Sequence, residues 1–300
     1  MNTPSNAIHE SALGAQATPP ATMSATRPFY WSVRRELWEN RSIYIVPLAV
    51  SAVMLVGFLI ASIGRAMSLS DPAQRVAVLS EPNDFAALLI MGTTFVVGIF
   101  YCLDALHGER RDRSILFWKS LPVSDLTTVL SKASIPLVIL PLLTFAITVV
   151  TQLIMILLGS AVLRGSGLTV TTHASFFQMS GELLYHLVTV HALWYAPIYC
   201  WLLLVSGWAR RAAFLWAALP IFAIGIIEKI AFGISHFVTL LAYRISGPEA
   251  YSIQSGNQMH SMAAPGLAGF LITPGLWIGL ALAAIFLAAA VRLRRYREPI

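Results

Sequence analysis

The chain has 300 residues, of which 57% are hydrophobic and only 11% are charged, and its mean hydropathy is +0.72. Soluble domains are about 45–50% apolar and about 25% charged, so this composition excludes a soluble globular protein and indicates an integral membrane protein. The formal net charge of +6 does not indicate nucleic-acid binding, because the basic residues are concentrated between long apolar runs.

The N-terminal segment is predicted to be cytoplasmic. Residues 1–26 are rich in Ser, Thr, Ala and Pro and lack the basic start and apolar middle of a signal peptide, so we expect a disordered tail. Residues 27–41 mix aromatic and charged side chains. Helical spacing places most of the charges on one side and an apolar set on the other: Tyr30, Val33, Leu37 and Trp38. This pattern is typical of an amphipathic helix at the membrane interface.

Six apolar runs follow, and most approach or exceed the ~20 residues that cross a ~30 Å hydrocarbon core. We predict an all-α membrane domain over residues 27–300, with six transmembrane helices at about 43–63, 85–106, 134–160, 183–207, 212–227 and 267–291. The connections 64–84 and 161–182 are expected to be polar loops. The connection 228–265 begins with an apolar segment too short to cross and return, so we expect a short re-entrant or interfacial helix there.

Most of the 20 Lys and Arg residues lie before the first span, in the second and fourth connections, or after the last span. By the positive-inside rule these segments face the cytoplasm, so both termini are predicted to be cytoplasmic. An even number of spans follows. The predicted location is the plasma (inner) membrane, in a multi-pass arrangement.

Polar residues inside the spans allow two interpretations. Thr144, Thr148 and Gln152 recur at i, i+4 and i+8 and share one face of the third span. This face either lines a substrate path or the seam between two permease copies, or its threonines bond carbonyls of their own helix while Gln152 bonds a neighbouring helix. Glu228 and Lys229 end the fifth span, either as an outer gate or as side chains that reach out to the interface.

The sequence offers no motif for catalysis. The only lysines are Lys119, Lys132 and Lys229, and none belongs to a G-x-x-x-x-G-K-[ST] phosphate loop, so we expect no ATP site, no cofactor and no enzyme activity in this chain. His186 and His191 are five residues apart, whereas two ligands of one metal ion on a helix are expected at i, i+4. A metal site is therefore not predicted.

The segment between the second and third spans concentrates charge next to an apolar patch. Between Gly108 and Pro122 we expect a short helix outside the bilayer, which would dock a soluble partner; the alternative is a solvated basic loop. Trp118 is the predicted anchor, and the flanking arginines are expected to be solvated rim charges. The predicted docking residues are Glu109, Arg110, Arg111, Arg113, Ile115, Leu116, Phe117, Trp118 and Leu121.

This segment resembles the cytoplasmic loop between the second and third spans of ABC-2 type transporter permeases. In that family an acidic and basic helix is followed by a Ser-Leu-Pro turn and by a Lys that opens the next span. The matching residues here are 108–113, 120–124 and Lys132. The resemblance implies an exporter permease that pairs with a second copy or paralogue within the membrane lipids. Its coupling helix would fit a groove on a separate ABC ATPase, which binds ATP and Mg²⁺.

Two other functions stay open from the sequence. The chain could be a membrane scaffold or immunity factor that recruits an ATPase without transporting a solute itself. A membrane-embedded enzyme would require Asp, Glu or His at one depth on several spans, whereas the sequence offers Asp104 near the inner face and scattered histidines.

Overall fold

The computed structural model describes residues 26–112, 114, 123–163, 173–254 and 267–296, and every regular element in these ranges is a helix. The predicted all-α class is confirmed. Five helical segments of the described chain are long and apolar enough to cross a membrane, and the number rises to six if one pair bent by 42° forms a single span. These helices support a multi-pass membrane protein.

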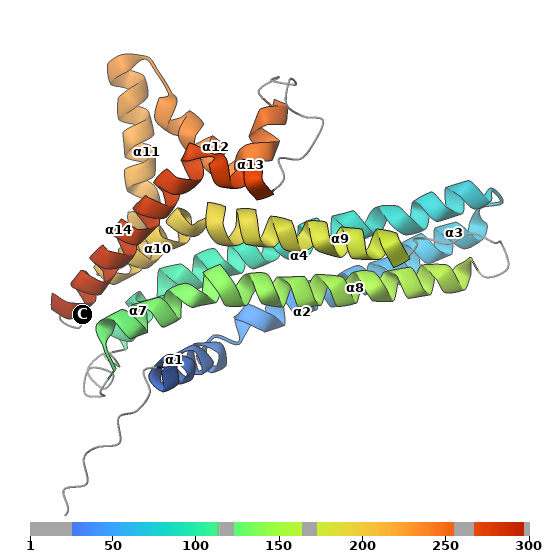
Figure 1. Ribbon diagram of the computed structural model, residues 1–300, viewed down its shortest axis with the longest axis horizontal. Helices are drawn as coiled ribbons and strands as arrows, with labels where there is room; N and C mark the ends of the chain where they lie inside the picture. The colour runs from blue at the N-terminus through green and yellow to red at the C-terminus, as the bar shows by residue number, and fades with distance from the viewer. Residues whose placement is uncertain (1–25, 113, 115–122, 164–172, 255–266, 297–300) are drawn as a thin grey trace, which may run out of the picture.

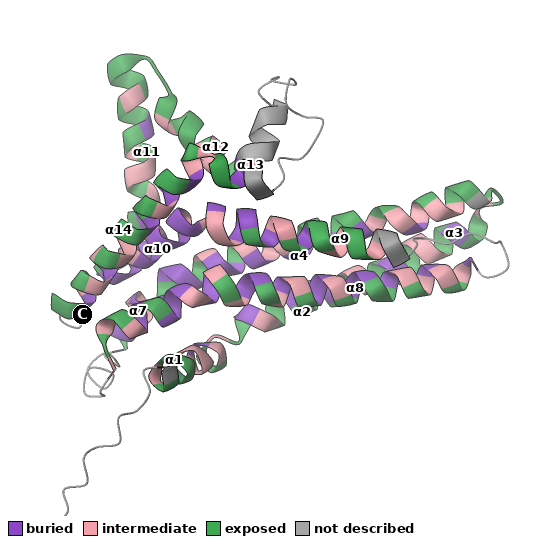
Figure 2. Ribbon diagram, in the orientation of Figure 1, coloured by how far each residue is buried: buried purple, intermediate pink, exposed green. Residues whose placement is uncertain are grey.

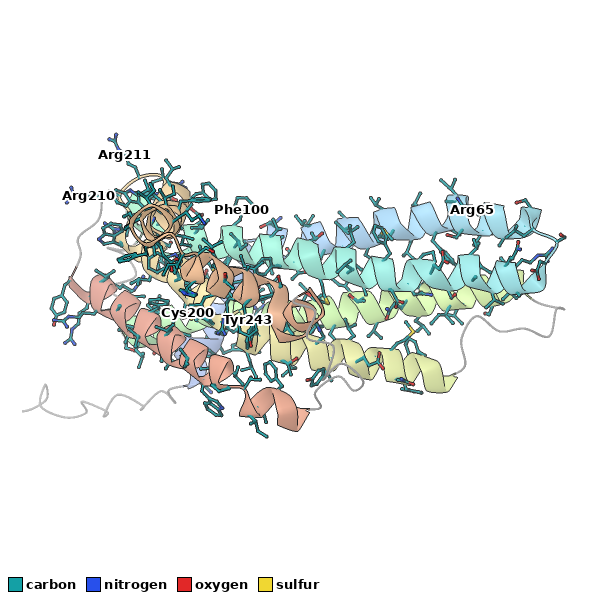
Figure 3. All side chains as sticks on the ribbon, turned by 90° about the horizontal axis from the view of Figure 1, so that it is seen from above. Arg65, Phe100, Cys200, Arg210, Arg211 and Tyr243 are labelled. Carbon is teal, nitrogen blue, oxygen red and sulfur yellow. The ribbon has the colours of Figure 1, made fainter. Side chains whose placement is uncertain are left out.

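The long helices lie side by side along one axis (Figure 1). Three elements meet at one end, here called the basic end: α1 (Thr26–Glu39), the start of α7 (Asp125–Ser134) and the end of α14 (Pro274–Tyr296). Arg210 and Arg211 also lie at this end, whereas Arg65 lies near the opposite one (Figure 3). The sequence assigned these arginines to opposite sides of the membrane, and the fold separates them accordingly.

The helix α1 turns one of its charged residues toward the bundle. Val33 and Leu37 pack against the main core as expected, but Glu36 is also turned inward and is only 1% exposed. Tyr30 and Trp38, which were placed on the apolar side, are largely exposed. The predicted segregation of charge is therefore wrong for Glu36, because buried partners of opposite charge compensate its carboxylate.

The helix that contains the second predicted span begins at Pro72, well before the predicted start at residue 85. One continuous helical segment of 27 residues carries the first span through α2 (Ser42–Gly57), η1 (Phe58–Ile63) and α3 (Gly64–Ser68). The helix α4 (Pro72–Ala105) then has 34 residues, about 51 Å at 1.5 Å per residue. The Asp71 side chain accepts a hydrogen bond from the Ala73 amide at 3.0 Å. Asp followed by Pro favours a helix start, so the predicted polar loop over 64–84 is wrong.

The third span is likewise longer than predicted. The helix α7 continues through η2 (Ile135–Ile139) into α8 (Leu140–Val162), which gives 38 helical residues in a row. Ser124 caps the start by accepting a hydrogen bond from the Thr127 amide at 3.1 Å. The short helix α5 (His107–Arg111) follows α4.

The fourth span is bent next to a proline. The helices α9 (His173–His186) and η3 (Leu187–Trp194) meet α10 (Ala196–Trp208) at 42° across Tyr195. Pro197 lacks the N–H that would bond the carbonyl four residues earlier, so the helix breaks at this point. The predicted polar loop over 161–182 is wrong at both ends, because α8 continues to Val162 and α9 starts at His173.

The last elements leave the common axis. The helices α11 (Ala213–Phe232) and α12 (His236–Gln254) stand away from the long helices as two arms in Figure 1, joined by a turn in which Gly233 has a φ of +67°. The helix α11 passes its predicted end at residue 227. A helix is present in the next connection, where a short one was expected, and it starts at His236. A break at Thr273 divides the predicted last span into α13 (Leu267–Ile272) and α14.

The main core lies between α2, α4, η2 and α10, and α14 packs lengthwise along α10. Fully buried members of this core include Ile43, Cys102, Leu140, Tyr199 and Leu203. Figure 2 shows buried residues along the inward faces of α4, α7, α8 and α10, whereas α11 is exposed over most of its length. An exposed apolar surface of this extent on α11 indicates contact with lipid or with another protein.

Candidate functional site

Six charged side chains gather at the basic end and form the charge cluster: Arg35 and Glu36 of α1, Glu109 of α5, Asp125 and Lys132 of α7, and Arg294 of α14. Three of them are acidic and three are basic, so the cluster is formally neutral. Four helices far apart in the sequence contribute. The charge cluster therefore connects these four helices, and it forms only when the chain is folded.

Lys132 lies at the centre of the charge cluster and is only 2% exposed. Its Nζ atom is 2.8 Å from the Glu36 carboxylate and 3.2 Å from the Glu109 carboxylate. One ammonium group thus joins α1 to α5 from its position in the last turns of α7. The resemblance singled out Lys132 as the residue that opens the next span, and the structure adds these two buried partners.

Glu36 receives two further donors. Arg35 Nη2 lies 2.8 Å from the same carboxylate oxygen that Lys132 contacts. The hydroxyl of Tyr101, a main-core residue of α4, donates to the other oxygen at 2.9 Å. Both oxygens of this buried carboxylate are therefore satisfied, and the hydrogen bond from Tyr101 connects the cluster to a membrane span.

Glu109 is the second acceptor and contacts three cations. Its Oε1 atom is 2.9 Å from Arg35 Nη2 and also faces Lys132, while its Oε2 accepts a hydrogen bond from Arg294. Arg294 also reaches Asp125 of α7 at 3.1 Å through its Nε atom. Through Glu109 the cluster fixes α5, the first turn of the predicted docking segment, to the last helix of the chain.

Electrostatic coupling within α1 follows from this geometry. Burial lowers the pKa of Arg35, but the nearby carboxylates of Glu36, Glu39 and Glu109 outweigh that effect and leave the pKa raised. Burial raises the pKa of Glu39, and Arg35 opposes this shift. Removing one partner from a buried ion pair typically costs about 3–5 kcal/mol, because the remaining charge stays buried without compensation.

Arg110 connects α5 to the end of α10. Its side chain is 6% exposed and donates from Nη1 to the carbonyl of Gly207 at 2.9 Å and to that of Ala209 at 3.3 Å, at the end of α10. Nearby, the Ser206 hydroxyl accepts hydrogen bonds from the amides of Leu106 and His107 at 3.0 and 2.8 Å. A guanidinium at a helix C-terminus satisfies carbonyls that have no partner inside the helix.

The predicted docking residues divide into three groups. Glu109 is buried in the charge cluster, and Arg110 is buried against the end of α10. The expectation that Arg110 is a solvated rim charge is therefore wrong, because carbonyls of α10 take the place of water. Arg111 is 61% exposed and pairs with Asp112, as a rim charge would. The remaining docking residues lie outside the described residues: Arg113, Ile115, Leu116, Phe117, Trp118 and Leu121.

The predicted polar face of the third span is buried inside the chain, and Gln152 on this face contacts α4. Thr144, Thr148 and Gln152 are at most 3% exposed. Thr144 donates to the Leu140 carbonyl of its own helix at 2.7 Å, and Gln152 donates to the Asn83 carbonyl of α4 at 3.4 Å. These two contacts are those of the helix-packing interpretation, whereas Thr148 makes neither.

Glu228 shapes the turn between α11 and α12. Its two carboxylate oxygens accept hydrogen bonds from the amides of His236 and Phe237 at 3.0 and 2.8 Å, so it caps the first turn of α12. Lys229 is exposed. A Glu eight residues before a helix start is not a recognised capping pattern, which is why the sequence did not indicate this role.

In the described part of the chain, no group of three or more His, Cys, Asp or Glu side chains could hold a metal ion. Comparisons with known proteins returned no match: no family model, curated protein or solved structure matches this chain. The charge cluster is therefore interpreted from its own geometry and from the local resemblance of residues 108–132.

Proposed function

We propose that this chain is the permease subunit of an ATP-driven ABC-2 type transporter and that it works as an exporter. The residues that resemble the family loop support this proposal, together with the apolar helices long enough to span a membrane. Because the sequence has no phosphate-loop lysine, a separate ATPase subunit would bind ATP and Mg²⁺ and supply the energy.

The observation that carries the proposal is the attachment of α5 at the start of the predicted docking segment. Glu109 connects α5 to α1, α7 and α14, and Arg110 connects it to α10. A solvated basic loop would need none of these buried contacts, which cost desolvation energy. A segment that transmits the movement of a partner does need buried contacts to the spans. Without such contacts the loop would move alone and the spans would stay in place.

In the proposed mechanism, ATP closes the ATPase dimer and displaces the docking segment. The charge cluster passes this displacement to α1, to the continuous α7–α8 segment and to α14, so that the helices move together. Alternating access requires two states of the permease with different affinities for the substrate. The exposed apolar surface of α11 is available for lipid or for the second permease copy that the family implies.

In this proposal the chain lies in the plasma (inner) membrane, and its basic end faces the cytoplasm with both chain termini on that side. The positive-inside rule supports this orientation, because Arg35, Lys132, Arg210 and Arg294 belong to segments at the same end. The ATPase, a cytoplasmic protein, would then meet the chain where α5 is attached.

The second candidate is a scaffold or immunity factor that recruits an ATPase without transporting a solute. It also needs a docking segment, so the charge cluster fits both candidates. The two differ in one measurable property. A transporter couples hydrolysis to a substrate, and a scaffold does not.

Native co-purification tests the proposal. Tagged wild-type chain should bring down an ATPase, and the reconstituted complex should hydrolyse ATP faster in the presence of a transported compound. Trp118→Ala should weaken the association by about 2 kcal/mol or more, roughly 30-fold, while the protein still inserts into the membrane. Arg111→Glu should act more weakly, and its effect should shrink at high salt because exposed charges are screened.

The matched control is Trp277→Ala, which truncates the same side chain at an exposed position near the start of α14, away from α5. It should leave association unchanged. An inserted Trp118→Ala protein that retains its ATPase as tightly as wild type contradicts docking through this residue. Wild-type chain that brings down no ATPase contradicts the transporter proposal, and an associated ATPase that no compound stimulates favours the scaffold.

A further inference from the structure

Two tryptophans of α1 surround one arginine on the outward face of this helix, and the three residues are here called the Trp–Arg cluster: Trp31, Arg34 and Trp38. The guanidinium carbon of Arg34 lies 5.1 Å from the centre of the Trp31 ring and 4.8 Å from that of the Trp38 ring. Both distances are within the about 6 Å at which a cation is attracted to an aromatic face. The two indoles therefore position the guanidinium.

Helical spacing places the Trp–Arg cluster on the side of α1 that the bundle leaves open. Its members recur at i, i+3 and i+7, which is one face of a helix. Another face carries Val33 and Leu37, which pack against the main core, and the buried Glu36. Trp31 and Trp38 are 58% and 67% exposed. The fixed face of α1 thus holds the exposed face in a constant position.

The position of α1 puts the Trp–Arg cluster close to the membrane surface. Figure 1 shows the long helices lengthwise and α1 foreshortened, so α1 runs across them, and it lies beside the end of the bundle rather than beyond it. The first span begins at Ser42, four residues after Trp38. Four residues extend at most about 14 Å, so the cluster cannot lie far from the start of this span.

The chemistry of the Trp–Arg cluster suits the phosphate of a lipid. Tryptophan is enriched where a membrane meets water, because its ring is apolar and its N–H is polar. Arginine binds phosphate through two parallel N–H groups at the edge of its planar guanidinium, and an aromatic ring over the guanidinium face leaves that edge accessible. The ion pairs that described arginines of α1 form all use Arg35, which points toward the charge cluster.

Tryptophan and arginine also occur at the centre of protein interfaces, so the surroundings of the cluster decide between a lipid and a protein partner. The exposed apolar surface continues from Trp38 into the first turns of α2, where Ile45 and Leu48 are half exposed. Exposed apolar side chains of a span lie against lipid chains. A ligand with an acidic headgroup and apolar chains therefore matches both parts of this surface, and anionic lipids are concentrated in the cytoplasmic leaflet.

We propose that Trp31, Arg34 and Trp38 form a binding site for one anionic phospholipid. Its phosphate accepts hydrogen bonds from the Arg34 guanidinium, the two indoles lie beside its headgroup, and its acyl chains run along the start of α2. The inference takes from the proposed function only the orientation of the basic end toward the cytoplasm. Transport itself is not required, so a chain that transports nothing still binds the lipid.

Native mass spectrometry of the purified full-length protein tests the site. Wild-type protein should retain phosphatidylglycerol in preference to phosphatidylcholine, whose phosphate carries a cationic choline. Arg34→Gln should weaken the retention of phosphatidylglycerol about tenfold, the effect expected from losing one charge-assisted hydrogen bond. Arg34→Lys should fall between wild type and Arg34→Gln, because it keeps the charge and loses the planar group.

Arg41→Gln is the matched control. Arg41 is an exposed arginine next to the start of α2, so its replacement changes the net charge of the same region by the same amount outside the Trp–Arg cluster. At about 0.15 M salt, screening over about 8 Å should keep its effect within about twofold. Equal losses in Arg34→Gln and Arg41→Gln would mean a diffuse attraction between charges, and that result overturns the site.

Photo-crosslinking locates the bound lipid. Phosphatidylglycerol with a photoreactive headgroup should label residues 26–41 of the wild-type protein, and Arg34→Gln should lose this label while keeping its melting temperature. Label that is absent from residues 26–41, or that persists in Arg34→Gln, overturns the proposal. So does displacement of the lipid by an equal concentration of glycerol phosphate, which would indicate a site for soluble phosphate. Loss of a co-purifying protein in Arg34→Gln with unchanged lipid retention would assign the face to a protein partner instead.

Discussion

Replacing Lys132 by Met should destabilise the folded protein more than any other single substitution in the charge cluster. Methionine keeps the apolar stem and removes the ammonium group that lies 2.8 Å from Glu36 and 3.2 Å from Glu109. Both carboxylates would stay buried with one positive partner fewer. Losing one member of a buried ion pair costs about 3–5 kcal/mol.

The lower end of that range is expected here, because Arg35 still contacts both carboxylates and Arg294 still contacts Glu109. A loss of about 3 kcal/mol reduces the ratio of folded to unfolded protein on the order of 100-fold. At about 2–4 °C for each kcal/mol in a chain of this size class, the melting temperature should fall by roughly 6–12 °C.

Thermal unfolding in one detergent, followed by the fluorescence of a thiol-reactive dye, measures this effect, since Cys102 and Cys200 are buried in the folded protein. Arg111→Met is the matched control. Arg111 pairs with Asp112 at 3.1 Å, but both side chains are more than 60% exposed, and such pairs contribute about 0–1 kcal/mol. Its melting temperature should therefore stay within about 4 °C of wild type.

A double variant separates loss of charge balance from loss of packing. Adding Glu36→Gln to Lys132→Met removes one charge of each sign, so the double variant should be less destabilised than the sum of its two single variants, with a coupling of about 0.5–3 kcal/mol. Equal melting temperatures for Lys132→Met and Arg111→Met would refute the buried cluster, and strict additivity in the double variant would refute the coupling between Glu36 and Lys132.

Two further predictions concern topology and helix packing. Single cysteines at Ser70 and Tyr296, in a background without Cys102 and Cys200, should react with an impermeant thiol reagent in intact cells at Ser70 only; equal labelling of both positions would contradict the six-span arrangement. Gly279→Ala should lower stability by about 0.5–1.5 kcal/mol, because its added methyl carbon would lie 1.6 Å from Arg244 Nη2 and would displace the guanidinium from its hydrogen bond to the Gly275 carbonyl. Gly92→Ala, which meets no atom within 4 Å, should not lower it in the same thermal assay.

The sequence was sufficient for the helical class and for the location of most spans, because long apolar runs constrain a chain strongly. It was insufficient for helix ends. Residues 72–84 contain Pro82, Asn83 and Asp84 and were interpreted as part of a loop, yet the Asp71 cap and packing against α8 keep them helical. Local polarity predicted a loop, and tertiary contacts outweigh it here.

Only part of the charge cluster could be predicted from the sequence. Glu109 and Lys132 stood out as charges beside apolar runs, but nothing in the order of residues shows that they meet Glu36 and Arg294. Long-range pairing of charges depends on how helices are arranged, and spacing along one helix contains no information about it. Arg110 shows the same limit, because its partners are backbone carbonyls, which every residue has.

The charge cluster also imposes an order on biosynthesis. Glu109 and Arg294 are 185 residues apart, so at 5–20 residues per second on the order of 10–40 s separate their synthesis. During this interval Glu109 and Asp125 lack their partner Arg294. Because an unpaired carboxylate is costly to bury, the basic end of the incomplete chain should stay in contact with water. Insertion of α14 supplies Arg294 and seals that end. An unfinished or misinserted chain therefore exposes carboxylates that the finished protein hides, a chemical difference by which a membrane chaperone or protease would distinguish the two.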